Sequence, residues 1–317
     1  MQGVILAAGK GSRLQHITLR RSKAMLPILG KPMVERVMLD LVANGVEDFI
    51  LVVSPDDRYI THYFRRESDI KADVRFVYQP QRLGMANALA CAAPLLAGDF
   101  ILSACDNIVS AEHVGRMIDA WQWPSKPNAL LTLMPVEPDR ISSVGIVEME
   151  GPWVKRIVEK PQPKEAPSNI SSLPLYCFSP RILDYALQVR PSSRGEYELQ
   201  DAIQMLVERE GHVGSVMCKR RLTLTNAADL LAINQHYLTS GSDRPQITPQ
   251  TVGPSTQLVT PLRIESGTVI GANCVIGPNV YIERECRIGD GVTIRNAVLL
   301  SESVVPDGTT VADQVVS

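Results

Sequence analysis

Short apolar runs alternate along the chain with stretches whose apolar residues are three or four positions apart. The runs are typical of strands buried in a sheet, and they cover residues 4–6, 48–53, 74–78, 100–104 and 129–136. Helices are predicted between them, over residues 33–44, 56–66, 85–96 and 112–121. This alternation predicts a doubly wound α/β sheet, in which ligands bind beyond the carboxyl ends of the strands.

A different pattern follows a polar connector. Residues 239–256 are rich in Gly, Pro, Ser and Thr, as expected of a linker. After it an aliphatic residue recurs every six positions, at Ile264, Ile270, Ile276, Ile282, Ile288, Ile294 and Leu300. This hexapeptide period predicts a parallel β-helix of about two to three coils, since unrelated strands would not keep one register. We therefore expect two domains, covering residues 1–240 and 252–317.

Composition narrows the function classes. With 32 basic and 34 acidic residues the net charge is −2, and no basic excess points to nucleic acid or to a membrane surface. The amino-terminus enters a strand almost at once, and no long uncharged apolar span follows, so we expect a cytoplasmic protein. Six cysteines without CxxC spacing indicate reduced thiols rather than a disulfide framework or a zinc site.

The stretch from residue 4 to residue 32 has the features of a phosphate site. Residues with little side-chain bulk follow the first strand and would let backbone amides approach a ligand, namely Leu6, Ala7, Ala8, Gly9 and Gly11. Arg13 offers a planar fork and Lys23 a compact charge, a pair that suits a triphosphate. The spacing matches neither a Walker loop nor GxGxxG. An ordinary strand-to-helix turn would explain AAGK alone, but not the whole stretch.

Two further polar positions follow predicted strands. Gln79 can donate and accept hydrogen bonds at a nucleobase edge, and Gly84 leaves room for the base, although a surface glutamine is the plainer alternative. Asp106 ends an apolar strand. A carboxylate facing phosphates is unfavourable unless a divalent cation lies between them, so Asp106 is either a Mg²⁺ ligand or a loop or capping residue.

The segments LAAGKGSRL and SKAMLPILGKP resemble the signature of the sugar-1-phosphate nucleotidylyltransferases, which make nucleoside-diphosphate sugars. The departures, Ser12, His16 and Ser22, remove no charged group. The resemblance implies that Arg13 and Lys23 hold the phosphates of an NTP and that Asp106 binds Mg²⁺. QPQRLGMANA resembles the family's base-binding segment, which favours UTP or dTTP.

For the sugar half, the resemblance implies that a sugar 1-phosphate is bound by Gly145, Glu159, Lys160, Tyr176 and Arg194. Val144 and Pro174 depart from the family pattern, which puts the sugar in doubt. The family's second metal ligand is an Asp or Asn before the last helix of the domain. Here Thr223 falls at the Asp position, and Asn226 is the favoured ligand.

Two rival functions remain. The repeat resembles the left-handed β-helix of hexapeptide acyltransferases, so a bifunctional uridylyltransferase and acetyltransferase is possible, yet residues 252–317 contain no histidine to act as base. A silent regulatory subunit is the other rival, but the phosphate-site cations and Asp106 are retained. Every site candidate precedes Leu238. Removing 252–317 is therefore expected to leave nucleotide binding intact and to change the state of a homo-oligomer.

Overall fold

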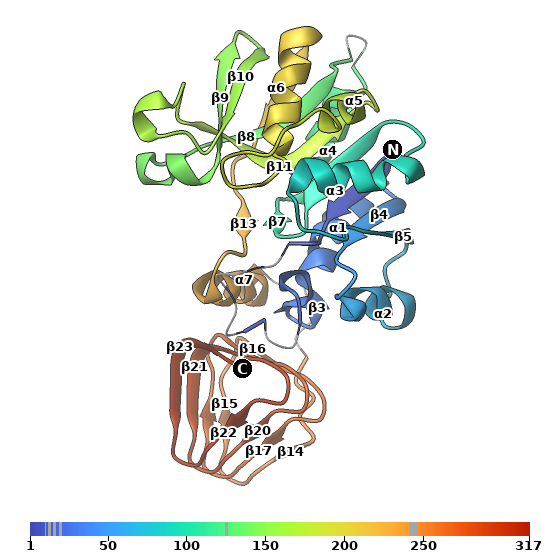
Figure 1. Cartoon of the computed structure of the whole chain (residues 1–317). Coiled ribbons are helices and arrows are strands. Elements are labelled where there is room, and N and C mark those ends of the chain that lie inside the picture. The colour runs from blue at the N-terminus through green and yellow to red at the C-terminus, as the bar shows by residue number, and fades with distance from the viewer. Residues whose placement is uncertain (10, 12–13, 15–16, 19–20, 124–125, 241–245) are drawn as a thin grey trace. The chain divides into compact units, whose positions relative to one another are not determined.

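The computed structural model describes residues 1–9, 11, 14, 17–18, 21–123, 126–240 and 246–317. The chain forms two compact units (Figure 1). One contains Met1–Lys10 and Val37–Arg221, and the other contains Gly11–Arg36 and Leu222–Ser317. The segment after the first strand therefore packs with the C-terminal part of the chain. The domain limits 1–240 and 252–317 remain a prediction.

The first unit is built on a mixed sheet with a parallel half. Strand β1 (Gln2–Leu6) lies between β4 (Asp48–Val53) and β6 (Phe100–Ala104) and runs parallel to both. Strand β5 (Asp73–Tyr78) extends this half beyond β4. Leu6 pairs with both Val52 and Ala104, so these parallel strands end at the same edge.

The other half of this sheet is mainly antiparallel. Strand β11 (Ile170–Phe178) pairs with β6, β8 (Ala129–Pro135) and β9 (Gly145–Glu150). Strands β9 and β10 (Trp153–Glu159) form a hairpin, and β12 (Val213–Met217) runs parallel to β8. This mixed α/β sheet, with helices packed on it, confirms the predicted fold class.

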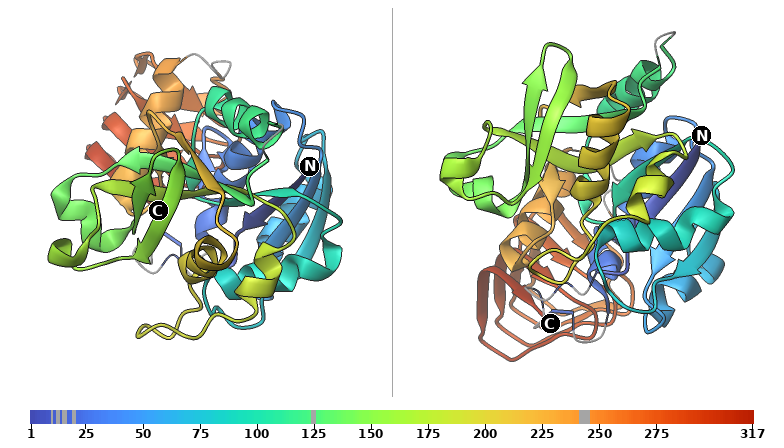
Figure 2. Two further views of the ribbon diagram at one scale, coloured as in Figure 1. Left: turned by 90° about the horizontal axis from the view of Figure 1, so that it is seen from above. Right: turned by 45° about the horizontal axis from the view of Figure 1, so that its top comes forward.

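Helices lie against this sheet (Figure 2). Helices α3 (Met85–Ala92), α5 (Ile182–Ala186) and α6 (Leu199–Arg209) share one apolar core with β1, β4 and β6. Helix α4 (Ala111–Trp121) packs on β8, β11 and β12, while α2 (Arg58–Arg66) follows β4. The helix predicted over 85–96 ends at Ala92, because Pro94, the second residue of the 3₁₀ turn Ala93–Leu95, lacks the amide hydrogen that would continue it.

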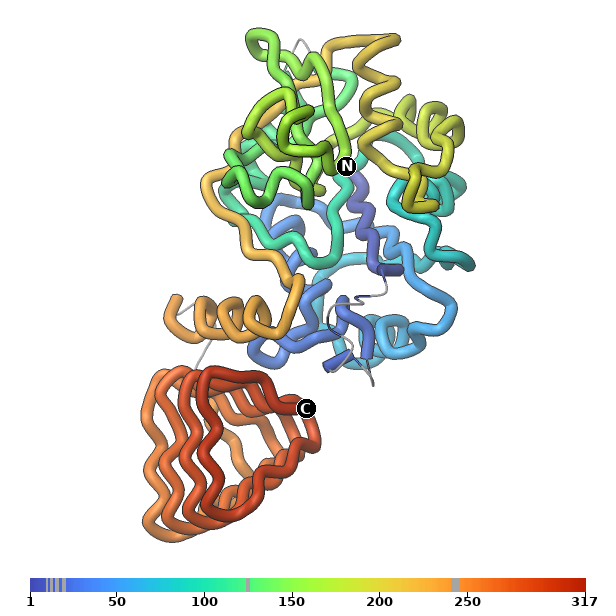
Figure 3. The backbone as a smooth tube through the Cα atoms, turned by 60° about the vertical axis from the view of Figure 1, so that its left-hand side comes forward, coloured from blue at the N-terminus to red at the C-terminus, as the bar shows by residue number. Residues whose placement is uncertain are grey.

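The C-terminal strands stack as the coils of a parallel β-helix (Figure 3). One stack is β14 (Thr251–Val252), β17 (Val269–Ile270), β20 (Arg287–Ile288) and β22 (Val304–Val305). A six-stranded sheet holds β15 (Gln257–Leu258), β18 (Val275–Ile276), β21 (Thr293–Leu299), β19 (Val280–Ile282), β16 (Leu262–Ile264) and β23 (Thr310–Val316). The β-helix confirms the hexapeptide prediction.

Two details of this repeat differ from the prediction. The prediction was about two to three coils, but one face of the β-helix has four stacked strands. The number is larger because strand pairing begins at Thr251, before the first residue of the predicted repeat. Ile264 pairs with Ile282, but Ile282 then pairs with Leu299 rather than Leu300. That coil is one residue shorter, so Leu299 takes the core position at its end.

The second unit also contains the segment that carries Lys23. Lys23–Met25 is a 3₁₀ turn, followed by the hairpin of β2 (Pro27–Ile28) and β3 (Lys31–Pro32). Helix α7 (Ala227–Ser240) contacts β2, β21 and β23. Strand β13 (Leu222–Thr223) also belongs to this unit. Helix α1 (Met33–Val42) begins in this unit after β3 and continues into the first unit, which also contains the short strand β7 (Asn107–Ile108).

Within the part of the chain that the structure describes, no helix has the length and apolar character that a bilayer crossing requires. All six cysteines are free thiols; Cys91 is half-buried and the other five are buried.

Candidate active site

Polar residues follow the parallel strands at their common edge. Ala7 and Ala8 continue from β1, with the Ala7 amide donating to Val52 O at 2.8 Å, and Gly9 is exposed. A Cβ built on Gly9 would meet no atom of the described residues within 4 Å. Gln79 follows β5 and Asp106 lies two residues beyond β6. The elements thus bring the turn, Gln79 and Asp106 to one edge.

Gln79 supports the turn that contains Gly84. Its Nε2 donates to Gly84 O at 3.1 Å and to Asn87 Oδ1 at 2.9 Å. Gly84 has φ +101°, and a Cβ there would lie 2.6 Å from Tyr197 O, so only glycine fits. With both amide hydrogens engaged inside the chain, Oε1 is the atom of Gln79 left to accept from a ligand.

Arg82 connects two of the predicted segments, although the sequence analysis missed it. Its Nε donates to Ala8 O in the glycine-rich turn at 2.9 Å, and its Nη2 donates to Ser54 Oγ at 3.1 Å. The signal was available, because Arg82 lies between Gln79 and Gly84 in the motif. Arg82 therefore ties the base-binding segment to the phosphate turn.

Asp106 is half-buried and has a cation near it. Burial lowers the pKa of the Arg221 guanidinium, and the Asp106 carboxylate opposes that shift. Nothing in the RRL sequence singles out Arg221. Beside Asp106, the buried Oδ1 of Asn107 has no hydrogen-bond partner among the described residues.

This environment fits Mg²⁺. Among the described residues no group of three or more His, Cys, Asp or Glu side chains could hold a metal ion. Mg²⁺ in phosphoryl-transfer sites is usually held by one or two carboxylates and the substrate phosphates, not by an all-protein cage. The half-buried Asp106 carboxylate, followed in the sequence by Asn107 with its unpartnered Oδ1, is the donor set that the protein could contribute to such a site.

In the second unit, Lys23 packs against Gly11. Gly11 has φ +62°, and a Cβ there would lie 3.0 Å from Lys23 Cβ. The neighbouring Ser22 hydroxyl is buried and has no hydrogen-bond partner among the residues described. A buried hydroxyl of this kind is explained if a ligand completes the site. Arg13 lies outside the described residues.

The predicted sugar residues form one cluster in the first unit. Gly145 and Glu159 pair across the β9–β10 hairpin. A Cβ on Gly145 would lie 3.2 Å from Glu159 Oε2, which is buried and without a hydrogen-bond partner in the described part of the chain. Lys160 Nζ lies 3.1 Å from Glu159 Oε1, and Arg194 Nη2 lies 3.5 Å from it. A buried acceptor without a hydrogen-bond partner among the described residues therefore lies beside Gly145, and two cations lie near the other oxygen of the same carboxylate.

Arg194 is held by a residue that the sequence analysis missed. Its Nη2 donates to Glu198 Oε1 at 2.6 Å, four residues along the chain. Burial alone would lower the pKa of Arg194, but Glu198, with Glu159 and Glu196, raises it. Gln200, also missed, approaches the Gly145 position, where its Cγ would lie 3.2 Å from a Cβ. Arg194 is thus a permanently charged group held by carboxylates.

Two predicted residues have structural partners of their own. Tyr176 is fully buried, its hydroxyl lies 2.8 Å from Ser172 Oγ, and burial raises its pKa. Asn226 caps helix α7, because its Oδ1 accepts from the Asp229 amide at 3.0 Å while Asp229 Oδ2 accepts from Asn226 N at 3.0 Å. Roles in sugar and metal binding remain predictions for both residues.

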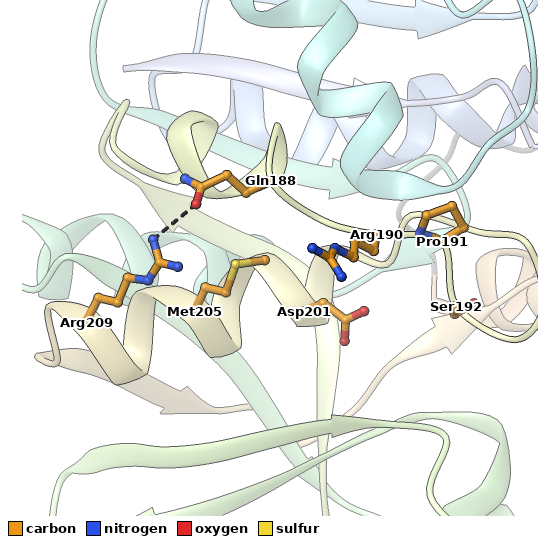
Figure 4. Close-up of a pocket in the computed structure, with 7 residues that line it drawn as sticks. All are labelled: Gln188, Arg190, Pro191, Ser192, Asp201, Met205 and Arg209. Atoms are coloured by element: carbon orange, nitrogen blue, oxygen red, sulfur yellow. Dashed lines mark hydrogen bonds between the residues drawn. The ribbon is translucent and has the colours of Figure 1, made fainter.

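A cavity of about 660 Å³ adjoins the sugar cluster (Figure 4). Its lining comes from the loop before α6 and from α6 itself: Gln188, Arg190, Pro191, Ser192, Asp201, Met205 and Arg209. Ser192 Oγ donates to Glu198 Oε1 at 2.8 Å, which links the lining to Arg194. None of these residues was predicted, since no motif marks them.

The chain thus combines a mixed α/β sheet, with polar residues following its parallel strands, and a parallel β-helix. A family model described as nucleotidyl transferase matches residues 2–240, and one described as the GMPPB C-terminal domain matches residues 258–317. The chain belongs to the nucleotidyl transferase family, which confirms the resemblance seen in its sequence. Enzymes of this family generally use a divalent metal.

Relatives with assigned names match different lengths of the chain. The UTP–glucose-1-phosphate uridylyltransferase AglF of Haloferax volcanii is 32% identical over 208 residues, which is 65% of this chain and 84% of that protein. Another Haloferax volcanii protein, the low-salt glycan biosynthesis nucleotidyltransferase Agl11, is 32% identical over 66% of this chain. The match covers 57% of the length of Agl11. The bifunctional protein GlmU of Methanococcus maripaludis is 26% identical over 100% of this chain and 77% of its own length.

Solved structures share the fold. A UDP-glucose pyrophosphorylase complexed with UDP-glucose has a TM-score of 0.69 at 21% identity, covering 75% of this chain and 98% of that one. The UTP-bound UGPase from Acinetobacter baumannii has a TM-score of 0.67 at 24% identity, and the match covers 76% of this chain and 94% of that one.

Proposed function

We propose that this protein transfers a nucleotidyl group from an NTP to a sugar 1-phosphate, forming an NDP-sugar and pyrophosphate. The observation that carries the proposal is the Glu159 cluster. Its buried Oε2 lies beside Gly145 and has no hydrogen-bond partner among the described residues, so a sugar hydroxyl bound here would satisfy it, and Lys160 and Arg194 lie near the Oε1 of the same carboxylate for the phosphate. Membership of the nucleotidyl transferase family supports this assignment.

The chemistry needs no protein nucleophile. An oxygen of the sugar phosphate attacks the α-phosphorus of the NTP, and the bond from that phosphorus to the oxygen bridging it to the β-phosphorus breaks. Pyrophosphate leaves with the electron pair. The attacking oxygen is already ionised, so positioning and charge neutralisation supply the catalysis.

Arg13 and Lys23 bind the triphosphate, with amides of the turn formed by Leu6, Ala7, Ala8, Gly9 and Gly11. Mg²⁺ held by Asp106, with Asn226 as second ligand, would offset phosphate charge.

We infer that the nucleotide is UTP or dTTP. Uracil and thymine carry an N3–H donor, which matches the Oε1 acceptor that Gln79 has to offer. Gly84, which packs directly against the Tyr197 backbone, belongs to the turn whose carbonyl accepts from Gln79, and this contact fixes the turn beside the proposed base site. The name of the relative AglF includes UTP and glucose 1-phosphate, which supports the same choice.

Three further assignments belong to this proposal. The cytoplasm suits six free cysteine thiols, which persist in a reducing compartment. A homo-oligomer suits the exposed valines Val269 and Val304 of the β14–β22 stack. Residues 1–240 form the catalytic domain and 252–317 the β-helix domain.

The test is pyrophosphate release from UTP, dTTP, CTP, ATP and GTP, each with a panel of sugar 1-phosphates and Mg²⁺. We expect product with UTP or dTTP, and Glu159→Gln should raise the KM for the sugar phosphate or lower kcat. Glu148→Gln is the matched control, since Glu148 lies on the same hairpin and pairs with exposed Lys155 at 3.0 Å. No product with any combination would refute the proposal, as would equal behaviour of the two variants.

Acetyl transfer is the second candidate, favoured by the GlmU relative that matches the whole chain. The β-helix, however, contains no histidine for general base catalysis. Incubation with acetyl-CoA and amino-sugar phosphates should release no CoA at enzymatic rates. Release at such rates would establish a second activity.

A further inference from the structure

An ion pair joins the β-helix to the segment that carries Lys23. Arg21 Nη1 donates to Glu283 Oε1 at 2.7 Å, and its Nη2 donates to Ser301 Oγ. Glu283 Oε2 accepts in turn from the Ser301 amide at 2.7 Å. The Arg21 and Glu283 side chains are 18% and 12% exposed, so water competes little with the pair. The Arg21 guanidinium therefore contacts side chains from two neighbouring coils of the β-helix, Glu283 and Ser301.

A second attachment lies at the β2–β3 turn. The Gly30 amide donates to the hydroxyl of fully buried Tyr281 at 3.0 Å. Gly30 has φ +79°, and a Cβ there would lie 2.7 Å from Glu265 Oε1, which pairs with Arg263. The turn therefore rests directly on the β-helix and tolerates no side chain. Between this turn and Arg21 lies the 3₁₀ turn that begins with Lys23.

The two attachments leave Lys23 little freedom. The Leu26 amide donates to Lys23 O at 3.2 Å, and the stem of Lys23 packs against Gly11 on its other side. A backbone attached at both ends and packed in between holds its side chain in a narrow range of positions. For a cation that must meet phosphate charge as it develops, a displacement of about 1 Å can cost roughly 10²-fold in rate.

We propose that Glu283 and Arg21 are positioning residues for nucleotidyl transfer, through which the β-helix holds Lys23 in place for the triphosphate. This rests on the proposed function, because it takes Lys23 to bind phosphate. It also revises the expectation that removing 252–317 leaves the nucleotide site intact, since Glu283, Ser301 and Tyr281 would all be lost. The β-helix is then part of the working site and not only an oligomerisation module.

The experiment uses the full-length chain and pyrophosphate release from UTP with its best sugar phosphate. Arg21→Ala and Glu283→Ala should each lower kcat roughly 10-fold or more, and the double variant should fall no further. The KM for the sugar phosphate should change less than about twofold, because its binding cluster is untouched. Arg21→Lys should rescue only part of the rate, since lysine keeps the charge and loses the fork. Arg295→Ala is the matched control. Arg295 pairs with Asp313 in the same β-helix at 3.5 Å, and 53% of its side chain is exposed.

A readout that needs no turnover accompanies the kinetics. Amide hydrogen exchange of residues 22–29 should speed up in Arg21→Ala and Glu283→Ala, but not in Arg295→Ala, with the thermal midpoints alike. Suppose that the wild type is active, that Lys23→Ala is impaired, and that Arg21→Ala has the same activity as Arg295→Ala. The positioning role would then be refuted, while the proposed function would stand. Additive effects of the two substitutions would also refute it. A wild type inactive with every substrate pair would refute the proposed function and this role with it.

Discussion

Replacement of Asn234 by leucine tests how the Lys23 segment is anchored to α7. Asn234 is fully buried, and its Oδ1 accepts from the Leu29 amide at 3.0 Å. Its Nδ2 donates to Pro27 O at 3.2 Å and to Leu230 O at 2.9 Å. One side-chain amide thus satisfies backbone groups of β2 and of the turn after it. Leucine has the same number and branching of side-chain heavy atoms and is bulkier, so the substitution removes these hydrogen bonds without opening a cavity for water.

The magnitude follows from the groups left behind. Leu29 N–H and Pro27 C=O would each lose a partner in a buried position, at about 1–3 kcal/mol each. Leu230 O belongs to a helix, so its loss should matter less. The second unit should therefore lose about 2–6 kcal/mol of stability, a large share of the about 5–15 kcal/mol that domains typically possess.

Hydrogen exchange monitored by mass spectrometry is the direct assay, because the Leu29 amide is itself the donor. Its protection should fall by more than about tenfold, since about 1.4 kcal/mol corresponds to a factor of ten, and the melting temperature seen by circular dichroism should fall. Thr239→Ala is the control, because Thr239 is exposed near the end of the same helix. If Asn234→Leu and Thr239→Ala gave the same protection and melting temperature, the anchoring argument would be refuted.

Other predictions concern the site and the acid stability of the fold. Lys23→Ala should lower kcat by roughly 10²-fold with little change in melting temperature, and wild-type turnover would remove Lys23 from the mechanism. Asp106→Ala should lose Mg²⁺-dependent activity; an unchanged metal dependence would require another ligand. Gly145→Ala should raise the KM for the sugar phosphate, because a methyl group would lie 3.2 Å from Glu159 Oε2, and an unchanged KM would place the sugar elsewhere. Burial, together with Arg116, lowers the pKa of His113 from 6.5 to about 4. The unfolded state then binds more protons in that window, so stability should be lost as the pH falls from about 6.5 to about 4. His113→Gln should flatten this loss in thermal melts, and an unchanged slope would contradict it.

The sugar cluster shows what the sequence could indicate and what it could not. Gly145, Glu159, Lys160 and Arg194, which the resemblance singled out, lie together in the structure, and their role in sugar binding remains a prediction. Glu198 escaped notice because a carboxylate at a helix start is common on any surface, and only folding places it against Arg194. The same holds for Arg221, which has no motif of its own and becomes notable only through its burial near Asp106.

The period of the apolar residues determined which segments are strands, helices and coils of a β-helix, because burial of one face depends on spacing alone. Residue chemistry likewise indicated a phosphate site, since small residues followed by cations suit few other ligands. Which segments pack together was decided only by the tertiary structure. Arg21 and Glu283, which form an ion pair, are 262 positions apart in the sequence. No local sequence pattern indicates which of the many surface carboxylates an arginine will pair with. The one-residue shortening that puts Leu299 in the core was also decided there, because stacking between coils outweighs a strict count of six.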